Sequence, residues 1–379
     1  MRILFLVYHG FSEVSGISKK IHYQVKGLRE NGHEVHLCYY DFDENGHRCR
    51  FVDGTVIKDY GSGVIAGIRQ RIDFGCVYKY CIQNHIEFVY ARSFQNANPF
   101  LIRFFNKLNK LRIKCVTEIP TFPYDQEFST FSRKQRCQLK LDQLFRNRLA
   151  KEMSAIVTFS DADFIFGQRT IRISNGVDFD SIPLHQYKPP IDNSIHLIGV
   201  AEVHIWHAFD RLIAGIGEYY ENVSNPRKVF FHIVGGVHPT ERYKANRFHP
   251  GLQAIIDKYG IQENIIFHGQ LFGEPLDEVF NHCCFAIGSL GRHRSGITVI
   301  KTLKNREYAT RGIPFIYSEQ DSDFDHQPYV VKAKPDESPI DILQILDFID
   351  NHQFCPNEIR KTVEKLSWKI QMQGVIAEA

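Results

Sequence analysis

Short apolar runs of strand length alternate with amphipathic segments along the chain. In the first half the strand-like runs are "RILFLVY" (2–8), "EVHLCYY" (34–40), "FVYAR" (88–92), "KCVTEI" (114–119) and "AIVTFS" (155–160). A helical segment, "KKIHYQVKGLRENG" (19–32), separates the first two and ends at Asn31-Gly32, a common helix stop. Strands that alternate with helices favour parallel pairing through right-handed crossovers. The pattern therefore predicts an α/β protein with a doubly wound sheet.

A turn-rich segment, "KPPIDNS" (188–194), interrupts this alternation, which then starts again. The later strand-like runs are "IHLIGVA" (195–201), "VFFHIVGG" (229–236), "IIFHGQ" (265–270), "FAIGSL" (285–290) and "PFIYS" (314–318). We therefore predict two Rossmann-like domains, 1–190 and 191–379, with a ligand cleft between the carboxyl ends of their strands. The last helical segment, 356–373, could pack back on the first domain.

Composition agrees with two ordinary globular domains. The chain has 379 residues, 43% hydrophobic and 23% charged, and its net charge of +3 is too small to predict binding to nucleic acid. Nine cysteines without a C-x-x-C spacing favour a reducing cytosol. The apolar run Ile3–Tyr8 is shorter than a signal-peptide core, and no stretch has the ~20 apolar residues of a membrane-spanning helix. We expect a cytoplasmic protein, with any membrane contact peripheral.

A glycine-bounded loop, from Gly10 to Gly16, follows the first strand and leads into a helix. Backbone N–H groups at such a helix start can hold an anionic or hydroxyl-rich ligand. A plain turn capped by Ser15 or Ser18 explains the same residues. Neither half has a complete G-x-G-x-x-G after its first strand, so a nicotinamide dehydrogenase is weakly supported.

Five segments of the second half, taken in order, resemble one enzyme family. They are "RISNGVDFDSI" (172–182), "FDRLIAGI" (209–216), "FHIVGG" (231–236), "YGIQENIIFHGQL" (259–271) and "REYATRGIPFI" (306–316). In this order they resemble motifs of the retaining glycosyltransferases of family 4, which have the two-domain GT-B fold. The resemblance covers residues from about 172 to 318, and the first domain fits more loosely.

The resemblance implies a donor site in the second domain. Glu307 matches the glutamate that binds the ribose hydroxyls of a nucleotide-sugar, and a carboxylate can accept from both hydroxyls of a cis-diol. The glycine-containing motifs place Gly235, Gly236 and Gly269 beside the donor. Alternatively, Glu307 forms a helical ion pair with Lys304 or Arg311.

The chain departs from the family at a second donor-binding position and in the following loop. Val299 stands where the family has another glutamate. The loop "GRHRSGI" (291–297) could bind phosphate through Arg292, His293 and Arg294, with Gly296 permitting close backbone approach. The alternative is a solvated basic loop.

The family's phosphate clamp is also altered. Glu202 and His207 occupy the positions of its arginine and lysine, and Glu202 cannot neutralise a phosphate. The cations that could replace the clamp are Arg292, Arg294, Lys301, Lys304 and Arg306. We place Lys304 first, because it shares a helix face with Glu307. His207 is expected either to keep a hydrogen-bonding role or to be structural.

The first domain should supply the acceptor side. Gly16, Arg92 and Asp125 are the candidate acceptor-side residues, and Glu118 matches a family position at a strand end that orients the acceptor or the transferred sugar. The resemblance implies sugar transfer with retention, with electrostatic stabilisation of the departing diphosphate. It also implies no metal and no other cofactor, and the H-x-x-H pairs lack a recognisable zinc pattern.

Two segments, 100–115 and 132–153, interleave lysines and arginines with apolar residues. They could lie on an anionic membrane surface, or be the solvent faces of ordinary helices. The sequence thus predicts a metal-independent hexosyltransferase acting on a glycan or lipid-linked oligosaccharide, in bacterial surface polysaccharide synthesis. The alternatives are a non-catalytic nucleotide-sugar-binding protein, or another GT-B enzyme such as a nucleotide-sugar epimerase or a phosphorylase.

Overall fold

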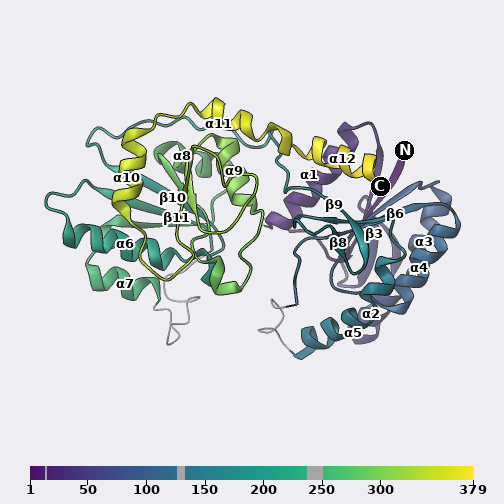
Figure 1. Ribbon diagram of the computed structural model, residues 1–379. Coiled ribbons are helices and arrows are strands. Elements are labelled where there is room, and N and C mark those ends of the chain that lie inside the picture. Colours follow the sequence, from purple (N-terminus) through teal and green to yellow (C-terminus); the bar gives the residue numbers. More distant parts are fainter. Residues whose placement is uncertain (13–14, 126–132, 237–250) are drawn as a thin grey trace. The chain divides into compact units, whose positions relative to one another are not determined.

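The computed structural model describes residues 1–12, 15–125, 133–236 and 251–379. These residues form two compact units (Figure 1). The first contains Met1–Gly176 and Lys365–Ala379, and the second contains Val177–Glu364.

The first unit is built on a mixed sheet with the strand order β4-β3-β2-β1-β5-β6-β7-β9-β8. The six strands from β2 to β9 in this order pair in parallel, whereas β3, β4 and β8 are antiparallel additions. Its elements are β1 (Arg2–Leu6), α1 (Gly16–Glu30), β2 (Glu34–Phe42), β3 (Arg48–Val52), β4 (Thr55–Asp59), α2 (Gly63–Ile72), α3 (Gly75–Gln83), β5 (Phe88–Arg92), α4 (Pro99–Lys110), β6 (Lys114–Ile119), α5 (Arg133–Ala150), β7 (Ala155–Thr158), β8 (Phe164–Ile165), β9 (Gln168–Arg172) and α12 (Trp368–Glu378).

The second unit has a parallel sheet with the order β12-β11-β10-β13-β14-β15. Its elements are β10 (Ile195–Val200), the 3-10 helix η2 (Ile205–His207), α6 (Phe209–Asn222), β11 (Val229–Val234), α7 (Leu252–Tyr259), η3 (Gln262–Asn264), β12 (Ile265–Gly269), α8 (Glu274–His282), β13 (Phe285–Ile287), η4 (Arg292–Ser295), α9 (Leu303–Arg311), β14 (Phe315–Tyr317), β15 (Val330–Lys332), α10 (Ile342–Asn351) and α11 (Pro356–Thr362). The short helix η5 (Glu364–Leu366) spans the junction of the units. Both sheets confirm the predicted pair of Rossmann-like folds.

The units divide at Gly176, not at the proline-rich segment near residue 190. The reason is that residues after Gly176 already bond to the second unit. His185 donates its backbone N–H to the Arg311 carbonyl at 2.7 Å, and Lys188 donates its own to the Asn281 carbonyl at 3.3 Å. The proline-rich segment therefore belongs to the second unit.

The last helix, α12, belongs to the first unit and packs along α1 (Figure 1). Gly27 of α1 makes this approach possible, since a Cβ there would lie 2.7 Å from the Trp368 backbone. Trp368, Met372 and Val375 join the hydrophobic core of this unit. Helix α12 is therefore part of the same unit as the first strand, β1.

Candidate functional site

The order of strands reverses between β10 and β13 in the second unit. Strands β11 and β12 follow β10 toward one edge of the sheet, and β14 and β15 follow β13 toward the other. In parallel α/β sheets, ligands bind at the carboxyl ends of the strands beside such a reversal. Helix α9 is fastened there by Tyr308, whose hydroxyl donates to the Ile287 carbonyl (3.0 Å) and accepts from the Val200 N–H (3.2 Å). The helix is therefore positioned against both strands.

Lys304 lies one turn before Tyr308 on α9. Its Nζ is buried and makes no hydrogen bond within the part of the chain that the structure describes. Burial, with a contribution from Arg292, lowers the pKa of Lys304 to about 7, although Glu319 acts in the opposite direction. A buried ammonium without a partner is unfavourable in the folded protein, so this group points to an anion that it would bind.

Two further charged groups share the electrostatic environment of Lys304. Arg292 begins η4, and its guanidinium lies 5.6 Å from the centre of the Trp206 ring. Glu319 follows β14 and is 1% exposed, and its Oε2 lacks a hydrogen bond among the described residues. Burial raises the pKa of Glu319, whereas Arg292 and Lys304 oppose this rise. Ser289, after β13, also has a buried Oγ without a partner there.

His207 interacts electrostatically with Lys304 and Arg292 and is a neutral group. It is 6% exposed, and burial together with Lys304 and Arg292 holds its pKa well below the ordinary value. Its Nδ1 accepts the His204 backbone N–H at 2.9 Å, so the neutral ring carries its proton on Nε2. His207 can therefore donate a hydrogen bond but supplies no positive charge.

One of the two arrangements predicted for Glu307, the helical ion pair, is present. Its side chain is 29% exposed, and Oε1 accepts from Arg311 at 3.1 Å, the helical ion pair expected as the alternative. Arg311 is itself held by Asp277 at 2.7 Å and lies over the Phe280 ring. Glu307 Oε2 has no hydrogen bond to the described residues, so it can still accept one from a ligand.

Two predicted phosphate ligands are engaged elsewhere. Arg294 is 3% exposed and bonds to both carboxylate oxygens of Asp210, at 2.9 and 2.7 Å, and to Glu337. His293 Nε2 lies 2.7 Å from Glu337 Oε1. Hydrogen bonds from Arg294 and His293 lower the pKa of Glu337 to about 2 despite partial burial. This differs from the expected phosphate contact, because the donors of Arg294 and His293 are used to fix η4.

The remaining clamp candidates are placed as follows. Arg306 is 1% exposed and forms ion pairs with Asp321 and Asp323, so it is a structural cation. Lys301 precedes α9 and is partly exposed. Glu202 is exposed in the β10–α6 loop, and Val299 is 47% exposed.

The predicted donor-side glycines have backbone roles. Gly235 has φ +138°, its N–H donates to the Gly269 carbonyl at 2.7 Å, and a Cβ there would lie 1.8 Å from the Ala201 carbonyl oxygen. Gly269 and Gly296 also have positive φ, and Gly296 ends η4. Gly236 would place a Cβ 3.2 Å from Gln270. These glycines let the loops at the carboxyl ends of β10, β11 and β12 approach each other closely.

The first unit has a cavity of 340 Å³ at its own strand-order reversal, between β1 and β5. It is lined by His9, Gly10, Ser12, Ser15, Ile17, Ser18, Arg92, Ser93, Phe94, Gln95 and Pro120. His9 Nδ1 donates to the Gly10 carbonyl at 2.8 Å, and burial lowers the His9 pKa. Neutral His9 therefore keeps a lone pair on Nε2 that can accept a proton or a hydrogen bond.

Two of the predicted acceptor-side residues lie at this cavity. Arg92 lines it, and Gly16 begins α1 beside it. Ser15 caps α1, since its Oγ accepts from the Ser18 N–H at 3.3 Å, as the alternative interpretation of this loop predicted. Asp125 is not among the lining residues and instead forms a two-bond ion pair with Arg146, at 2.7 and 3.0 Å.

Glu118 lies beneath the cavity at the end of β6 and is fully buried. Its oxygens accept from Gln24, Tyr90 and Arg92, each at 2.6 Å, and Lys20 lies 3.4 Å away. Burial would raise its pKa, but Lys20 and Arg92 dominate and lower it to about 2. This differs from the expected direct contact with an acceptor: the enclosed carboxylate can act only through Arg92.

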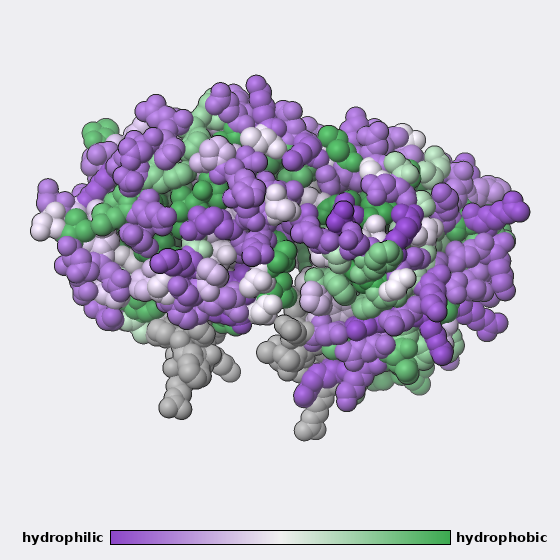
Figure 2. All heavy atoms as spheres, viewed as in Figure 1, coloured by the Kyte–Doolittle hydropathy of each residue, from purple (hydrophilic) through white to green (hydrophobic). Residues whose placement is uncertain are grey.

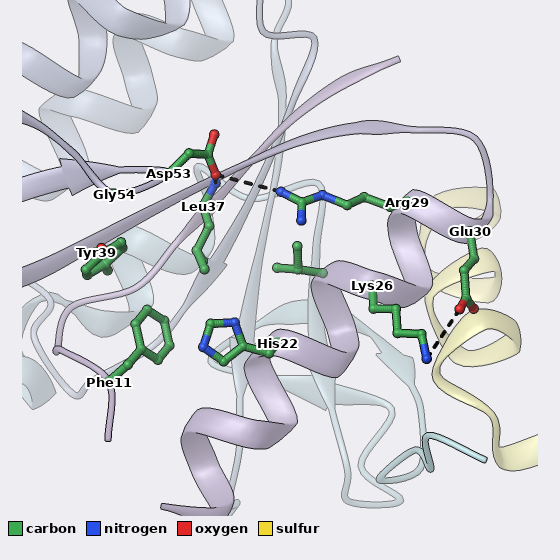
Figure 3. Close-up of a pocket in the computed structure, with 10 residues that line it drawn as sticks. Phe11, His22, Lys26, Arg29, Glu30, Leu37, Tyr39, Asp53 and Gly54 are labelled. Carbon is green, nitrogen blue, oxygen red and sulfur yellow. Dashed lines mark hydrogen bonds and ion pairs between the residues drawn. The ribbon is translucent and has the colours of Figure 1, made fainter. Parts of the chain in front are cut away.

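A larger, shallower groove of 790 Å³ lies between α1 and the turn from β3 to β4 (Figure 3). Its charged side chains pair with each other: Arg29 lies 3.7 Å from Asp53, and Lys26 lies 3.8 Å from Glu30. Most of the groove's lining residues lie along α1 and within or beside β2 and β3 rather than after the carboxyl end of a strand, so we do not assign it to the site.

The predicted basic helices differ in how they use their apolar residues. Helix α4 buries Leu101, Phe104, Phe105 and Leu108 in the core, as an ordinary surface helix does. Helix α5 exposes Leu141 and Leu144. Figure 2 shows that hydrophilic residues cover most of the visible face of the molecule. Within the described residues, no helix has the length and apolar character needed to cross a membrane, and the predicted peripheral contact stays a prediction.

The sequence patterns did not single out three residues of the candidate sites, His9, Ser289 and Glu319. Each lies two or three residues after the carboxyl end of a parallel-paired strand, at the edge where ligands bind. That position in the chain was the available signal. Charge and the family motifs drew attention to the basic loop instead.

No protein-family model matches the sequence, and no curated protein matches it. Solved structures do match the fold. Sucrose-phosphate synthase from Thermosynechococcus elongatus aligns with 13% identity and a TM-score of 0.64, over 99% of this chain and 97% of that one. The lipopolysaccharide outer core galactosyltransferase WaaB aligns with 13% identity and a TM-score of 0.62, over 100% and 99%.

The chain has the GT-B fold. This fold is shared by enzymes of another kind: a UDP-GlcNAc 2-epimerase from Neisseria meningitidis, solved with UDP-GlcNAc, aligns with 9% identity and a TM-score of 0.53, over 100% and 99%. At these identities the likeness concerns the fold, and the choice of reaction depends on the residues of the site.

Proposed function

We propose that this protein is a retaining glycosyltransferase that transfers a hexose from a nucleotide-sugar to a glycan or lipid-linked oligosaccharide. The observation that carries the proposal is the buried, unpartnered ammonium of Lys304 at the strand-order reversal of the second unit. Arg292 and the Nε2–H of His207 share its environment. A diphosphate would supply the missing anionic partner.

The donor would lie along the start of α9. Lys304 and Arg292 would bind the diphosphate, His207 would donate a hydrogen bond to it, and Oε2 of Glu307 would accept from a ribose hydroxyl. Lys301 precedes this helix and is a further candidate for the phosphates. The glycine-bounded loops that hold Gly235, Gly236, Gly269 and Gly296 would allow the donor to approach the backbone.

The reaction needs stabilisation of the leaving group. As the bond from the anomeric carbon to the diphosphate breaks, negative charge grows on the phosphate oxygens, where fixed cations in a dry site are most effective. Lys304 and Arg292 fill this role without a metal ion or other cofactor. The acceptor hydroxyl would bind in the cavity of the first unit, with His9 and Arg92 as its polar contacts.

The choice of acceptor rests on analogy. The galactosyltransferase of similar fold acts, by its name, on lipopolysaccharide outer core, and a surface polysaccharide or its lipid-linked precursor is the corresponding proposal here. The exposed leucines and basic residues of α5 are suited to a peripheral contact with an anionic membrane, on the cytoplasmic side where nucleotide-sugars are made.

Binding tests the donor site first. Calorimetric titration of a panel of nucleoside diphosphates and nucleotide-sugars should give saturable binding that Lys304→Ala abolishes. Glu307→Gln should weaken binding by roughly 1.5–3 kcal/mol, the usual contribution of a charge-assisted hydrogen bond. Lys334→Ala is the matched control, because Lys334 is an exposed lysine of the same unit. Unchanged affinity in Lys304→Ala would refute the proposed site.

Product identification then decides the reaction. Transfer to an acceptor with the donor's anomeric configuration kept supports the proposal. An epimerised nucleotide-sugar formed without acceptor would assign the site to an epimerase. Release of a sugar phosphate from a glycan and inorganic phosphate would assign it to a phosphorylase. Binding of a nucleotide-sugar without turnover on any acceptor would identify a non-catalytic binding protein.

A further inference from the structure

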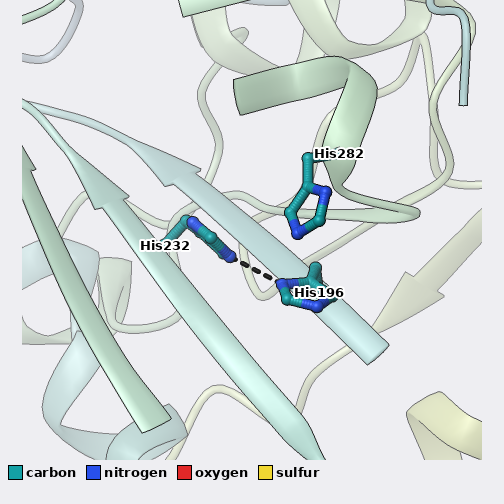
Figure 4. Close-up of side chains that lie close together, drawn as sticks. All are labelled: His196, His232 and His282. Carbon is teal, nitrogen blue, oxygen red and sulfur yellow. Dashed lines mark hydrogen bonds between the residues drawn. The ribbon is translucent and has the colours of Figure 1, made fainter. Parts of the chain in front are cut away.

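Three histidines of the second unit gather over the face of its sheet, away from the carboxyl ends of the strands. His196 is the second residue of β10, His232 lies in β11, and His282 ends α8 (Figure 4). One ring nitrogen from each lies within 4.8 Å of the others. The rings of His196 and His282 are 4.1 Å apart, and those of His232 and His282 are 5.7 Å apart.

The hydrogen bonds around His196 and His232 define where their protons lie. The Ser194 hydroxyl donates to Asp192 Oδ1 (2.6 Å), because a carboxylate only accepts. Ser194 Oγ must therefore accept from His196 Nε2 (3.0 Å), which leaves a lone pair on His196 Nδ1. That lone pair faces His232 Nε2 at 2.8 Å. Burial lowers the pKa of His196 to about 4 and that of His232 to about 3, so both rings are neutral at neutral pH.

We propose that His196 Nδ1, His232 Nε2 and a ring nitrogen of His282 bind a zinc ion, with water as the fourth ligand. Three imidazoles and a water form a common zinc coordination set. Tetrahedral zinc with bonds of about 2.0–2.1 Å holds its ligand nitrogens about 3.3 Å apart. The facing nitrogens of His196 and His232 would therefore need to separate by about 0.5 Å from 2.8 Å, and the nitrogen of exposed His282, which lies within 4.8 Å of them, would adjust to the same spacing. His282 is exposed and provides the route by which the ion and its water enter.

The hydrogen-bond partners of the proposed histidine ligands are also suited to a zinc site. Ser194 and Asp192 already orient His196 through its second nitrogen, and His268 Nε2 lies 2.8 Å from His232 Nδ1. Such contacts fix the ring and the tautomer of a metal-bound histidine. Proton balance requires His232 to release its Nε2 proton and accept one on Nδ1 from His268 Nε2. His268, which is partly exposed, recovers a proton from solvent on Nδ1, so no net proton is lost.

The ion would cross-link three elements of the second unit, although its water ligand makes the site an open one rather than the closed four-ligand type. It would join β10 and β11 to the end of α8. Its ligands lie near the amino end of β10, whereas His207 follows the carboxyl end of that strand. It would therefore raise the stability of the second unit without taking part in sugar transfer. A second group, Asp43, Cys49 and Asp59, is less suitable, since Asp43 and Asp59 already accept backbone N–H groups of their own turns.

Metal titration of the full chain tests the proposal. After chelator treatment and dialysis, zinc should bind with one tight site and raise the thermal unfolding temperature. Co²⁺ should give the intense visible absorption of a four-coordinate ion. His282→Gln should weaken zinc binding by at least about 100-fold, because the loss of a direct ligand should cost no less than the roughly 10–100-fold loss caused by removing a contact behind a ligand. His282 is exposed, so this variant should fold normally, which circular dichroism would check.

His352→Gln is the control, because His352 is an exposed histidine of the same unit outside the cluster. It should bind zinc like the wild type. Equal zinc affinity in wild type and His282→Gln, or a weak six-coordinate Co²⁺ spectrum, would overturn the proposal. The histidines would then form a metal-free hydrogen-bonded chain that ends at Asp192. His232→Gln gives a second measurement if it folds, and His282→Gln decides the question if it does not.

Discussion

Lys304→Met should make the protein more stable while removing its affinity for nucleoside diphosphates. Methionine keeps the length and apolar stem of lysine but has no charge. The pKa of Lys304 falls from its ordinary 10.5 to about 7, which corresponds to about 5 kcal/mol at about 1.4 kcal/mol per unit. This is an upper estimate of the cost of burying the ammonium, so we expect a gain of about 3 kcal/mol near pH 7.

The pH dependence of this gain identifies its cause. Between the folded pKa near 7 and the unfolded pKa near 10.5, the unfolded chain holds a proton that the folded chain has released. Wild-type stability therefore rises with pH in this window, relative to the variant. The advantage of Lys304→Met should be full below pH 7 and should shrink by up to about 1.4 kcal/mol per pH unit above it.

Urea unfolding of both proteins from pH 6.5 to 9.5 measures this difference. Circular dichroism follows the whole chain, and tryptophan fluorescence reports Trp206 of the second unit together with Trp368 of the first. A variant that is less stable than the wild type, or a gain independent of pH, would refute the assignment of Lys304 as a strained buried cation.

Proton uptake links the same group to the ligand. Because Lys304 is about half protonated near pH 7, binding of a diphosphate should draw a proton onto it. Calorimetry in buffers of different ionisation enthalpy should detect this uptake in the wild type and not in Lys304→Met. Binding without linked uptake would place the phosphates away from Lys304.

Three further changes separate structural residues from ligand-binding ones. Glu118→Gln should destabilise the first unit by roughly 3–5 kcal/mol, by leaving its buried cations unpaired; the contribution of Glu118 should be present above its unfolded pKa of about 4.5 and be lost as pH falls through about 2, which acid titration of wild type and variant would show. Gly235→Ala should cost about 2–3 kcal/mol of urea stability, because its Cβ would lie 1.8 Å from the Ala201 carbonyl oxygen; a neutral result would mean that the loop is not held as described. Arg294→Ala should lower the thermal unfolding temperature by leaving the buried Asp210 carboxylate unpaired, yet change nucleotide affinity less than twofold, and a large loss of affinity would restore Arg294 as a phosphate ligand.

The sequence predicted the regular part of the fold because alternating apolar runs determine where buried parallel strands lie. It missed β3 and β4, whose sequences "RCRFV" and "TVIKD" carry charged residues on a hairpin at the sheet edge. The unit boundary was misplaced for a different reason. Prolines mark a break in local structure. The boundary instead depends on hydrogen bonds between residues far apart in the sequence, such as that from His185 to Arg311, which are 126 positions apart (311 − 185).

The site was predictable to the level of a segment, but not to the level of a side chain. The basic turn that holds Arg292 and Arg294 was found, although only burial and partners distinguish the two. Asp210 lies 84 residues before Arg294, and Glu337 lies 43 residues after it, so neither pairing is visible in local spacing. From residue type alone, Arg292 and Arg294 were both predicted to bind phosphate.

The loop after β10 supplies no positive charge at the two positions where the family resemblance predicted a phosphate clamp. A neutral His207 and an acidic, exposed Glu202 cannot provide positive charge from the loop after β10. A diphosphate bound at this sheet edge would need its counter-charge from the other side of the strand-order reversal, where Arg292 and Lys304 follow β13. Those two cations repel each other, which contributes to the low pKa of Lys304, whereas buried Glu319 acts in the opposite direction. A bound diphosphate would relieve the remaining repulsion. The buried charge of Lys304, which lowers stability, would therefore favour binding of a doubly charged ligand.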